Sequence, residues 1–151
     1  MHVYFGTVTR GGVLPDGGEL IKLDWDSKRV LAKAPGLRSL ATAGDDPNPR
    51  GNARGYRGVA SHADRVIAAN YHTLQIYDLN LEHLRSINHG LMVDLHELYL
   101  PSDGSVWVCS TALDAALRYD LKTGDLLESL LPRQMPQVQR DQRALRRTPW
   151  T

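Results

Sequence analysis

The sequence predicts an all-β protein, and two observations lead to that prediction. Short segments rich in Val, Ile, Leu and aromatic residues recur along the chain, and Gly, Asn and Asp separate them, as in strands joined by tight turns. A phrase of apolar strand, Asp and apolar residue also occurs three times, at 21–25, 75–79 and 117–121. Helix signals are weak, and only 137–147 favours a short basic helix. We therefore expect repeated units of antiparallel strands.

The repeated residues Asp24, Asp78 and Asp120 align the strands of three units. The strand before the Asp spans 19–23, 73–77 and 115–119, and a more apolar strand precedes it at 3–7, 66–71 and 106–111. A more polar strand follows at 29–33, 83–87 and 126–130. Units two and three begin with a further strand, at 58–62 and 97–100, which the first unit lacks. Each Asp is predicted to accept hydrogen bonds from N–H groups of the next turn, which is a structural role.

The spacing of the units predicts a particular architecture. Asp78 and Asp120 are 42 residues apart, and a period of about 40–45 residues with four strands is typical of a β-propeller blade. We predict a partial β-propeller over residues 1–131, with about three blades at approximately 1–40, 57–88 and 94–131, the first lacking its innermost strand. A loop rich in Gly, Pro and Arg at 43–58 interrupts the period, and a basic tail follows at 132–151.

Residues 57–131, and more loosely 3–34, resemble the blades of bacterial propellers of the quinoprotein-like, arylsulfotransferase-like and gluconolactonase-like groups. The shared element is a strand and turn leading into Val-Trp-Val-Cys-Ser at 106–110, followed by Tyr-Asp at 119–120. The resemblance implies the fold. It assigns no lactonase, sulfotransferase or quinone site to residues of this chain, because no such residue set can be matched position by position.

Composition and charge limit the kinds of partner and the cellular location that we expect for the protein. The 151 residues carry a net charge of +1, so no global field indicates nucleic acid or a membrane as a partner. Cys109 is the single cysteine, which excludes an intrachain disulfide and favours a reducing, cytoplasmic location. The first residues read as a strand rather than as a signal peptide. Five Arg and one Asp fall within 132–151, and we expect this tail to order against a neighbouring protomer; the alternative is a disordered tail.

A candidate ligand site follows from the blade alignment. Arg57 and His96 start the innermost strands of blades two and three, where propellers face their channel, and Asp94 flanks His96. With Arg54, these are the predicted ligand-binding residues. His89, Asp94 and His96 could hold a divalent metal through imidazole and carboxylate, although their spacing is not a metal motif. The structural alternative is that these side chains bond groups between blades. No catalytic residue and no cofactor is predicted.

The loop at 50–58 offers a second alternative. It holds three Arg, three Gly and a Tyr, which could cradle an anion through N–H groups and guanidinium groups or bind single-stranded RNA. The simpler interpretation is a long inter-blade loop with Gly at tight turns. The near-zero net charge counts against nucleic acid.

The blade count leads to the functional prediction. Propellers have four to eight blades, and three blades leave two apolar blade faces open. The chain is therefore expected to be completed by self-association or by a second polypeptide. The alternatives are a truncated or split gene product and a curved partial propeller with swapped strands. We predict a non-catalytic interaction or scaffold module. The alternatives are a small-molecule binder or a hydrolase- or lyase-type enzyme with its site at the channel mouth, and anion or RNA binding through the loop.

Overall fold

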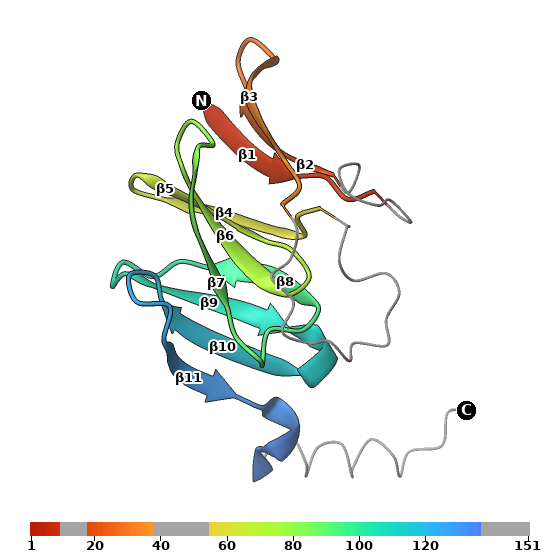
Figure 1. The fold of residues 1–151 in the computed structure, drawn as a ribbon, viewed down its shortest axis with the longest axis vertical. Helices are drawn as coiled ribbons and strands as arrows, with labels where there is room; N and C mark the ends of the chain where they lie inside the picture. Colours follow the sequence, from red (N-terminus) through yellow and green to blue (C-terminus); the bar gives the residue numbers. More distant parts are fainter. Residues whose placement is uncertain (10–17, 38–54, 137–151) are drawn as a thin grey trace, which may run out of the picture.

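The computed structural model describes residues 1–9, 18–37 and 55–136. It contains three antiparallel sheets placed one after another along the long axis (Figure 1). Blade A consists of β1 (His2–Gly6), β2 (Glu19–Asp24) and β3 (Arg29–Pro35). Blade B consists of β4 (Gly58–His62), β5 (Arg65–Ala69), β6 (Thr73–Asp78) and β7 (His83–Asn88). Blade C consists of β8 (Leu95–Tyr99), β9 (Ser105–Ser110), β10 (Ala115–Asp120) and β11 (Leu126–Leu130).

The predicted fold class, an all-β partial propeller, is confirmed. Within each blade the strands pair in chain order, β1-β2-β3, β4-β5-β6-β7 and β8-β9-β10-β11, and each strand lies within two residues of its predicted bounds. Within the described residues, blade A lacks the innermost strand, as expected. Two single-turn 3₁₀ helices, Thr111–Leu113 and Pro132–Gln134, complete the described elements. The expected helix at 137–147 and the loop residues 43–54 lie outside the described residues.

The three blades share a β-bulge at the same position, which identifies them as copies of one unit. The pairing of the last two strands shifts register between Lys22 and Leu23 in blade A. The same shift falls between Ile76 and Tyr77 in blade B and between Arg118 and Tyr119 in blade C. Such a β-bulge places an extra residue on one strand and increases the local twist. The bulge precedes the repeated Asp by the same interval each time, so positions can be compared between blades.

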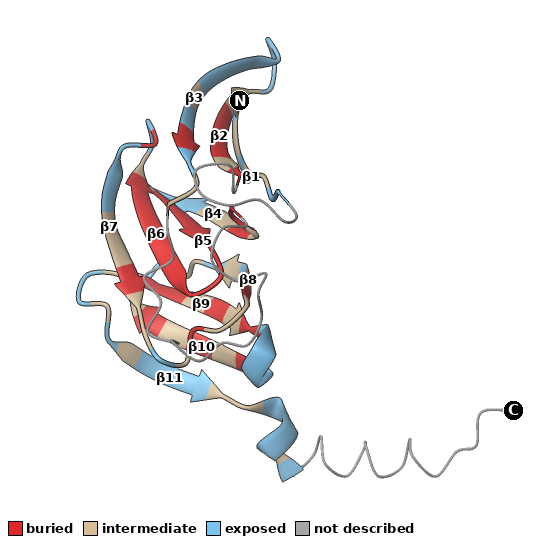
Figure 2. Ribbon diagram, turned by 45° about the vertical axis from the view of Figure 1, so that its right-hand side comes forward, coloured by how far each residue is buried: buried red, intermediate tan, exposed pale blue. Residues whose placement is uncertain are grey.

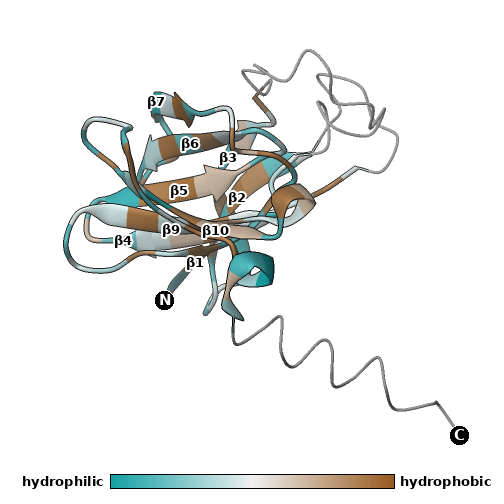
Figure 3. Cartoon of the chain, turned by 90° about the horizontal axis from the view of Figure 1, so that it is seen from below, coloured by the Kyte–Doolittle hydropathy of each residue, from teal (hydrophilic) through white to brown (hydrophobic). Residues whose placement is uncertain are grey.

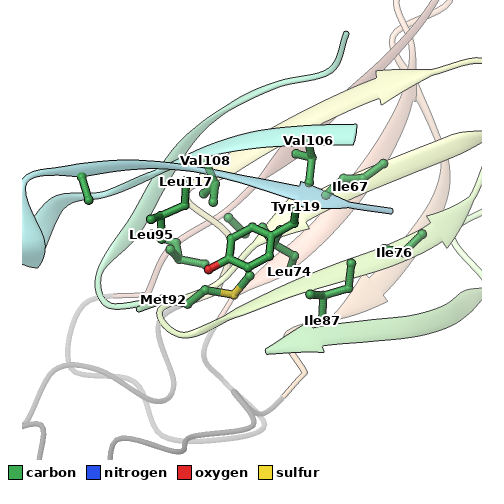
Figure 4. Packing of buried hydrophobic residues seen from close by; sticks show 12 residues of the cluster. Ile67, Leu74, Ile76, Ile87, Met92, Leu95, Val106, Val108, Leu117 and Tyr119 are labelled. Atoms are coloured by element: carbon green, nitrogen blue, oxygen red, sulfur yellow. The ribbon is translucent and has the colours of Figure 1, made fainter. Parts of the chain in front are cut away.

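The cores lie between the blades. Between blades A and B, buried Leu20 and Ala34 pack with Tyr56, Val66 and Tyr77. The larger layer between blades B and C brings together twelve buried residues from both sheets and the 89–94 connection, centred on Leu74, Leu117 and Tyr119 (Figure 4). Buried residues follow β2, β5, β6, β9 and β10 (Figure 2), and β5 and β6 carry the broad hydrophobic bands (Figure 3). Stacking of sheets, rather than closure of one sheet, therefore stabilises the chain.

Two equivalent tyrosines in these layers differ in their hydrogen bonding. Tyr77 Oη lies 2.5 Å from Tyr56 Oη, with the rings edge to face. Tyr119 Oη is buried and has no hydrogen-bond partner in the described part of the chain, and Figure 4 shows its ring among Met92, Leu95 and Leu74. Burial raises the pKa of both phenols, so both are neutral. An unpaired buried hydroxyl destabilises the folded state.

Tyr119→Phe is therefore expected to raise the free energy of unfolding by about 1 kcal/mol, because the substitution removes an unpaired hydroxyl and keeps the ring. Tyr77→Phe removes the hydrogen bond between Tyr77 and Tyr56 and is expected to lower the free energy of unfolding by about 1 kcal/mol. Urea unfolding at one fixed protein concentration measures both. Equal destabilisation by the two substitutions would show that Tyr119 Oη is hydrogen-bonded in the folded protein.

Candidate functional site

The repeated Asp carboxylates hold the turns that follow them. Each accepts hydrogen bonds from N–H groups of its own turn: Asp26 for Asp24, Asn80 and Glu82 for Asp78, and Lys122 and Thr123 for Asp120, at 2.7–3.1 Å. The Ser27 hydroxyl and the Asp26 N–H lower the pKa of Asp24. The N–H groups of Thr123 and Lys122 do the same for Asp120. The carboxylates are thus engaged locally, as hairpin-setting groups.

Three of the four predicted ligand residues meet between blades B and C. Arg57 precedes β4, whereas Asp94 precedes β8 and His96 lies in it. The Arg57 guanidinium donates a hydrogen bond to the Asp94 carboxylate, and its Nη1 lies 2.8 Å from His96 Nε2. It also lies over the Tyr71 ring, 5.4 Å from the centroid. The fourth predicted residue, Arg54, is outside the described residues.

This cluster joins two blades. The Arg57 side chain is only 13% exposed, and its charge is opposed by Asp94 at hydrogen-bond distance. Asp94 in turn accepts a hydrogen bond from Thr111 Oγ1, 2.9 Å away, so the carboxylate bonds groups of both blades. A partly buried, bidentate-capable guanidinium held in this way fixes orientation between elements. The arrangement also leaves polar atoms of three side chains converging on one point, which a small ligand could use.

His89 is engaged elsewhere. Its Nδ1 accepts a hydrogen bond from the Leu91 N–H at 3.2 Å, and its ring lies 5.7 Å from that of Tyr119. Within residues 1–9, 18–37 and 55–136, no group of three His, Cys, Asp or Glu side chains is placed to hold a metal ion. The metal candidates therefore do not form one cluster in that part of the chain.

The face of blade A that points away from blade B is apolar. Tyr4, Leu20, Ala32 and Ala34 pack toward blade B, and strand alternation therefore directs the intervening residues to the opposite face. We call Val3, Phe5, Ile21 and Leu23 the outward face of blade A. Their equivalents are Val66, Ala68, Gln75 and Tyr77 in blade B and Val106, Val108, Leu117 and Tyr119 in blade C, all at most 1% exposed. Phe5, by contrast, is 38% exposed.

The face of blade C that points away from blade B is mixed in character. Val106, Val108, Leu117 and Tyr119 pack inward, so the alternate residues Trp107, Cys109, Ala116 and Arg118 form what we call the outward face of blade C. Arg118 donates hydrogen bonds to Asp103 at 2.5 Å and to Ser105 Oγ at 3.0 Å. Burial, and secondarily the Glu97 charge, raises the pKa of the Cys109 thiol, which favours the unreactive form.

A further cavity of about 450 Å³ lies where turns of blades B and C approach each other. Apolar side chains, including Ile67, Ile76 and Leu100, line it together with the cations Arg65, Arg85 and Lys122. Asp64 lies 2.9 Å from Arg65 and offsets part of this charge. No sequence pattern indicates this cavity, because its lining comes from five separate stretches of the chain.

The comparisons with known proteins identify the fold. No family model and no curated relative matches the sequence. Among solved structures, the chain is similar to the Neurospora crassa Pan2 WD40 domain, with a TM-score of 0.58 and 12% identity over 83% of this chain and 37% of that one. It is similar to the WD40 β-propeller domain of Doa1, with a TM-score of 0.52 and 13% identity over 85% and 50% of the two chains.

A third similar structure is a protein of unknown function from Bacteroides caccae, with a TM-score of 0.55 and 11% identity over 89% of this chain and 48% of that one. The chain thus has the blade architecture of a β-propeller and spans half or less of the length of these structures. The sequence contains one Trp-Asp pair, Trp25–Asp26, one residue beyond the repeated Asp24. No helix among the described residues is long and apolar enough to cross a membrane.

Proposed function

We propose that this chain is a non-catalytic interaction module that assembles into a larger β-structure through the outward faces of blades A and C. One observation carries the proposal. The outward face of blade A places Val3, Phe5, Ile21 and Leu23 at positions that are at most 1% exposed in the other two blades. A neighbouring blade covers the same repeat positions in blades B and C. In blade A, Phe5 is 38% exposed and Val3 and Leu23 are partly exposed, whereas Ile21 is buried.

Covering the apolar surface of these outward faces would stabilise an assembly. Burial of apolar surface contributes about 25 cal/mol per Å², and one sheet face packed on another is the arrangement that stabilises the rest of this chain. An apolar sheet face left in water also promotes unspecific association. A further blade on this face, from a second copy or from another polypeptide, would remove that surface from water. The WD40 similarity supports the fold that such packing requires.

Phe5→Glu is expected to weaken assembly, because it places a charge at the centre of the outward face of blade A. Sedimentation velocity of the wild-type chain from about 1 to 100 µM should show concentration-dependent association. The variant should shift that association to at least about tenfold higher concentration, the effect of about 1.4 kcal/mol.

Leu113→Glu is the matched control. Leu113 is 39% exposed, against 38% for Phe5, and it lies in the 3₁₀ helix of blade C rather than on a sheet face. The control should associate like the wild type. Equal association by all three chains, or a wild type that remains monomeric throughout the concentration range, would contradict the proposal.

A second candidate function is small-molecule binding at the cluster of Arg57, Asp94 and His96, which the convergence of these three side chains supports. It ranks below assembly because the guanidinium is already opposed by a carboxylate and little exposed. If the chain bound a divalent ion or phosphate and the binding required His96, small-molecule binding would become the favoured function. Anion or RNA binding through the 50–58 loop depends mainly on residues outside those described.

A further inference from the structure

We infer that the partner is a second copy of this chain, joined head to tail, with the outward face of blade C of one copy on the outward face of blade A of the other. The inference rests on the proposed function and names its partner and orientation. It follows from a contact that blade A already makes with blade B inside one chain, and from the residues that stand at the same positions at the two ends.

Inside the chain, an aromatic–cation pair on blade A contacts the next blade. Tyr4 Oη donates a hydrogen bond to the Leu79 carbonyl at 2.9 Å, and Lys22 Nζ donates to Asn80 Oδ1 at 3.4 Å. Both acceptors lie in the turn between β6 and β7 of blade B. The Lys22 ammonium also lies 5.9 Å from the centroid of the Tyr4 ring. These contacts show how one blade recognises the turn of the following blade.

Blade C carries the same pair on its outward face. Arg118 stands two residues before the repeated Asp120, as Lys22 stands two residues before Asp24. Trp107 is the cross-strand partner of Arg118, as Tyr4 is of Lys22. The Arg118 guanidinium lies 5.9 Å from the Trp107 ring, the same separation as in blade A. No following blade lies next to this pair in the described part of the chain.

The turn that this pair would meet in a second copy is the β2–β3 turn of blade A, residues 25–28. By its interval from the repeated Asp, Asp26 stands at the position of Asn80. The neutral acceptor of Lys22 is therefore replaced by a carboxylate, which suits the Arg118 guanidinium. The Asp26 side chain is 74% exposed. It lies 2.5 Å from the Met1 amino group, and a carboxylate can accept further donors.

A second pair of charges matches in the same orientation. Arg85 of blade B donates hydrogen bonds to the Lys122 and Thr123 carbonyls in the β10–β11 turn of blade C, the latter at 3.3 Å. The equivalent of Arg85 in blade C is Glu128. Arg85 pairs across the strands with Ile76, two residues before Asp78, and Glu128 pairs in the same way with Arg118, two residues before Asp120. Glu128 Oε2 lies 3.6 Å from Arg118 Nη1 of its own chain. In a head-to-tail pair, Glu128 would also approach the 25–28 turn, in which Lys28 is exposed.

The two ends of the chain are therefore complementary in charge, guanidinium to carboxylate and carboxylate to ammonium, on either side of apolar surface. Complementary charges of this kind fix the register of an interface and select the partner. Two copies would bring together six sheets, within the four to eight blades of propellers. A closed pair uses each end of each copy once, in two equivalent junctions related by a two-fold axis.

Charge reversal with complementation tests this arrangement. Arg118→Glu alone and Asp26→Arg alone each place like charges at both junctions of a closed pair, and each should weaken self-association about tenfold or more. An equimolar mixture of the two variants should associate like the wild type. A mixed pair has one native junction and one with the charges exchanged, so both junctions attract. Sedimentation equilibrium at about 0.1 M salt measures this, and higher salt should narrow the differences.

Asp64→Arg is the control, because Asp64 is 72% exposed and lies in the β4–β5 turn, away from both outward faces. It should associate like the wild type. Asp26→Asn, which reproduces the acceptor that Lys22 already uses at Asn80, should weaken association less than Asp26→Arg. It serves as a second variant if charge reversal unfolds the chain.

Self-association that all these substitutions leave unchanged, or that the mixture fails to restore, would overturn the head-to-tail arrangement while leaving the proposed function in place. A wild-type chain that does not self-associate would instead overturn the proposed function.

Discussion

Gly58→Ala is expected to lower the free energy of unfolding by about 3 kcal/mol or more, because blades B and C meet at this residue without room for a side chain. An added Cβ would lie 1.8 Å from the carbonyl oxygen of His96 and 3.2 Å from Leu98 Cγ. The first obstacle is backbone of the neighbouring innermost strand, which cannot rotate away. The innermost strands β4 and β8 would have to separate, and the adjacent Arg57–Asp94 contact would separate with them.

Gly90→Ala is the matched control for this prediction, because its Cβ would meet no atom within 4 Å. Both substitutions remove similar backbone freedom from the unfolded chain, so the difference between them isolates the clash. Chemical denaturation followed by circular dichroism measures both. Equal stabilities of the two variants would show that the blades are not in contact at Gly58.

Leu117→Ala is expected to lower the free energy of unfolding by about 3 kcal/mol, within the range of about 2–5 kcal/mol for large-to-small changes in cores. Leu117 is fully buried in the layer between blades B and C. Its removal leaves a cavity lined by residues of two different sheets, and neither sheet can fill it without changing its own register. The layer is the larger of the two cores, so a loss there affects both blades.

Leu127→Ala is the comparison for this second prediction, since Leu127 is 52% exposed in β11 of the same blade. The expected change is below about 0.5 kcal/mol, as for other surface substitutions. Guanidinium unfolding at constant protein concentration keeps any contribution from assembly fixed. A loss for Leu127→Ala equal to that for Leu117→Ala would contradict the stacking of blades B and C.

Much of the fold could be predicted because the repeat reports strand order directly. Three copies of strand-Asp align the strands, and alternation within β10 already distinguishes Leu117 and Tyr119 from Ala116 and Arg118. The blade alignment also brought Arg57 and His96 to neighbouring strands, where the structure places them together. In these cases the repeat in the sequence corresponds directly to the repeat of blades and strands in the structure.

The remaining features depend on which face of a sheet meets a neighbour. A shift of one residue exchanges the two faces of a strand, so the repeat alone did not show that Phe5 and Trp107 lie on outward faces. The unpaired Tyr119 hydroxyl is a further example, because Tyr77 has the same sequence context and a partner in Tyr56. Such differences arise from contacts between distant segments, which short sequence patterns do not report.

The mass of the wild-type chain in solution distinguishes a closed pair of chains from a single chain. Multi-angle light scattering at about 50 µM is expected to give twice the 16.8 kDa of one chain, because the outward faces of blades A and C complete each other in a pair. A mass of 16.8 kDa at that concentration and above would contradict the account. Those faces would then be stable in water without a partner.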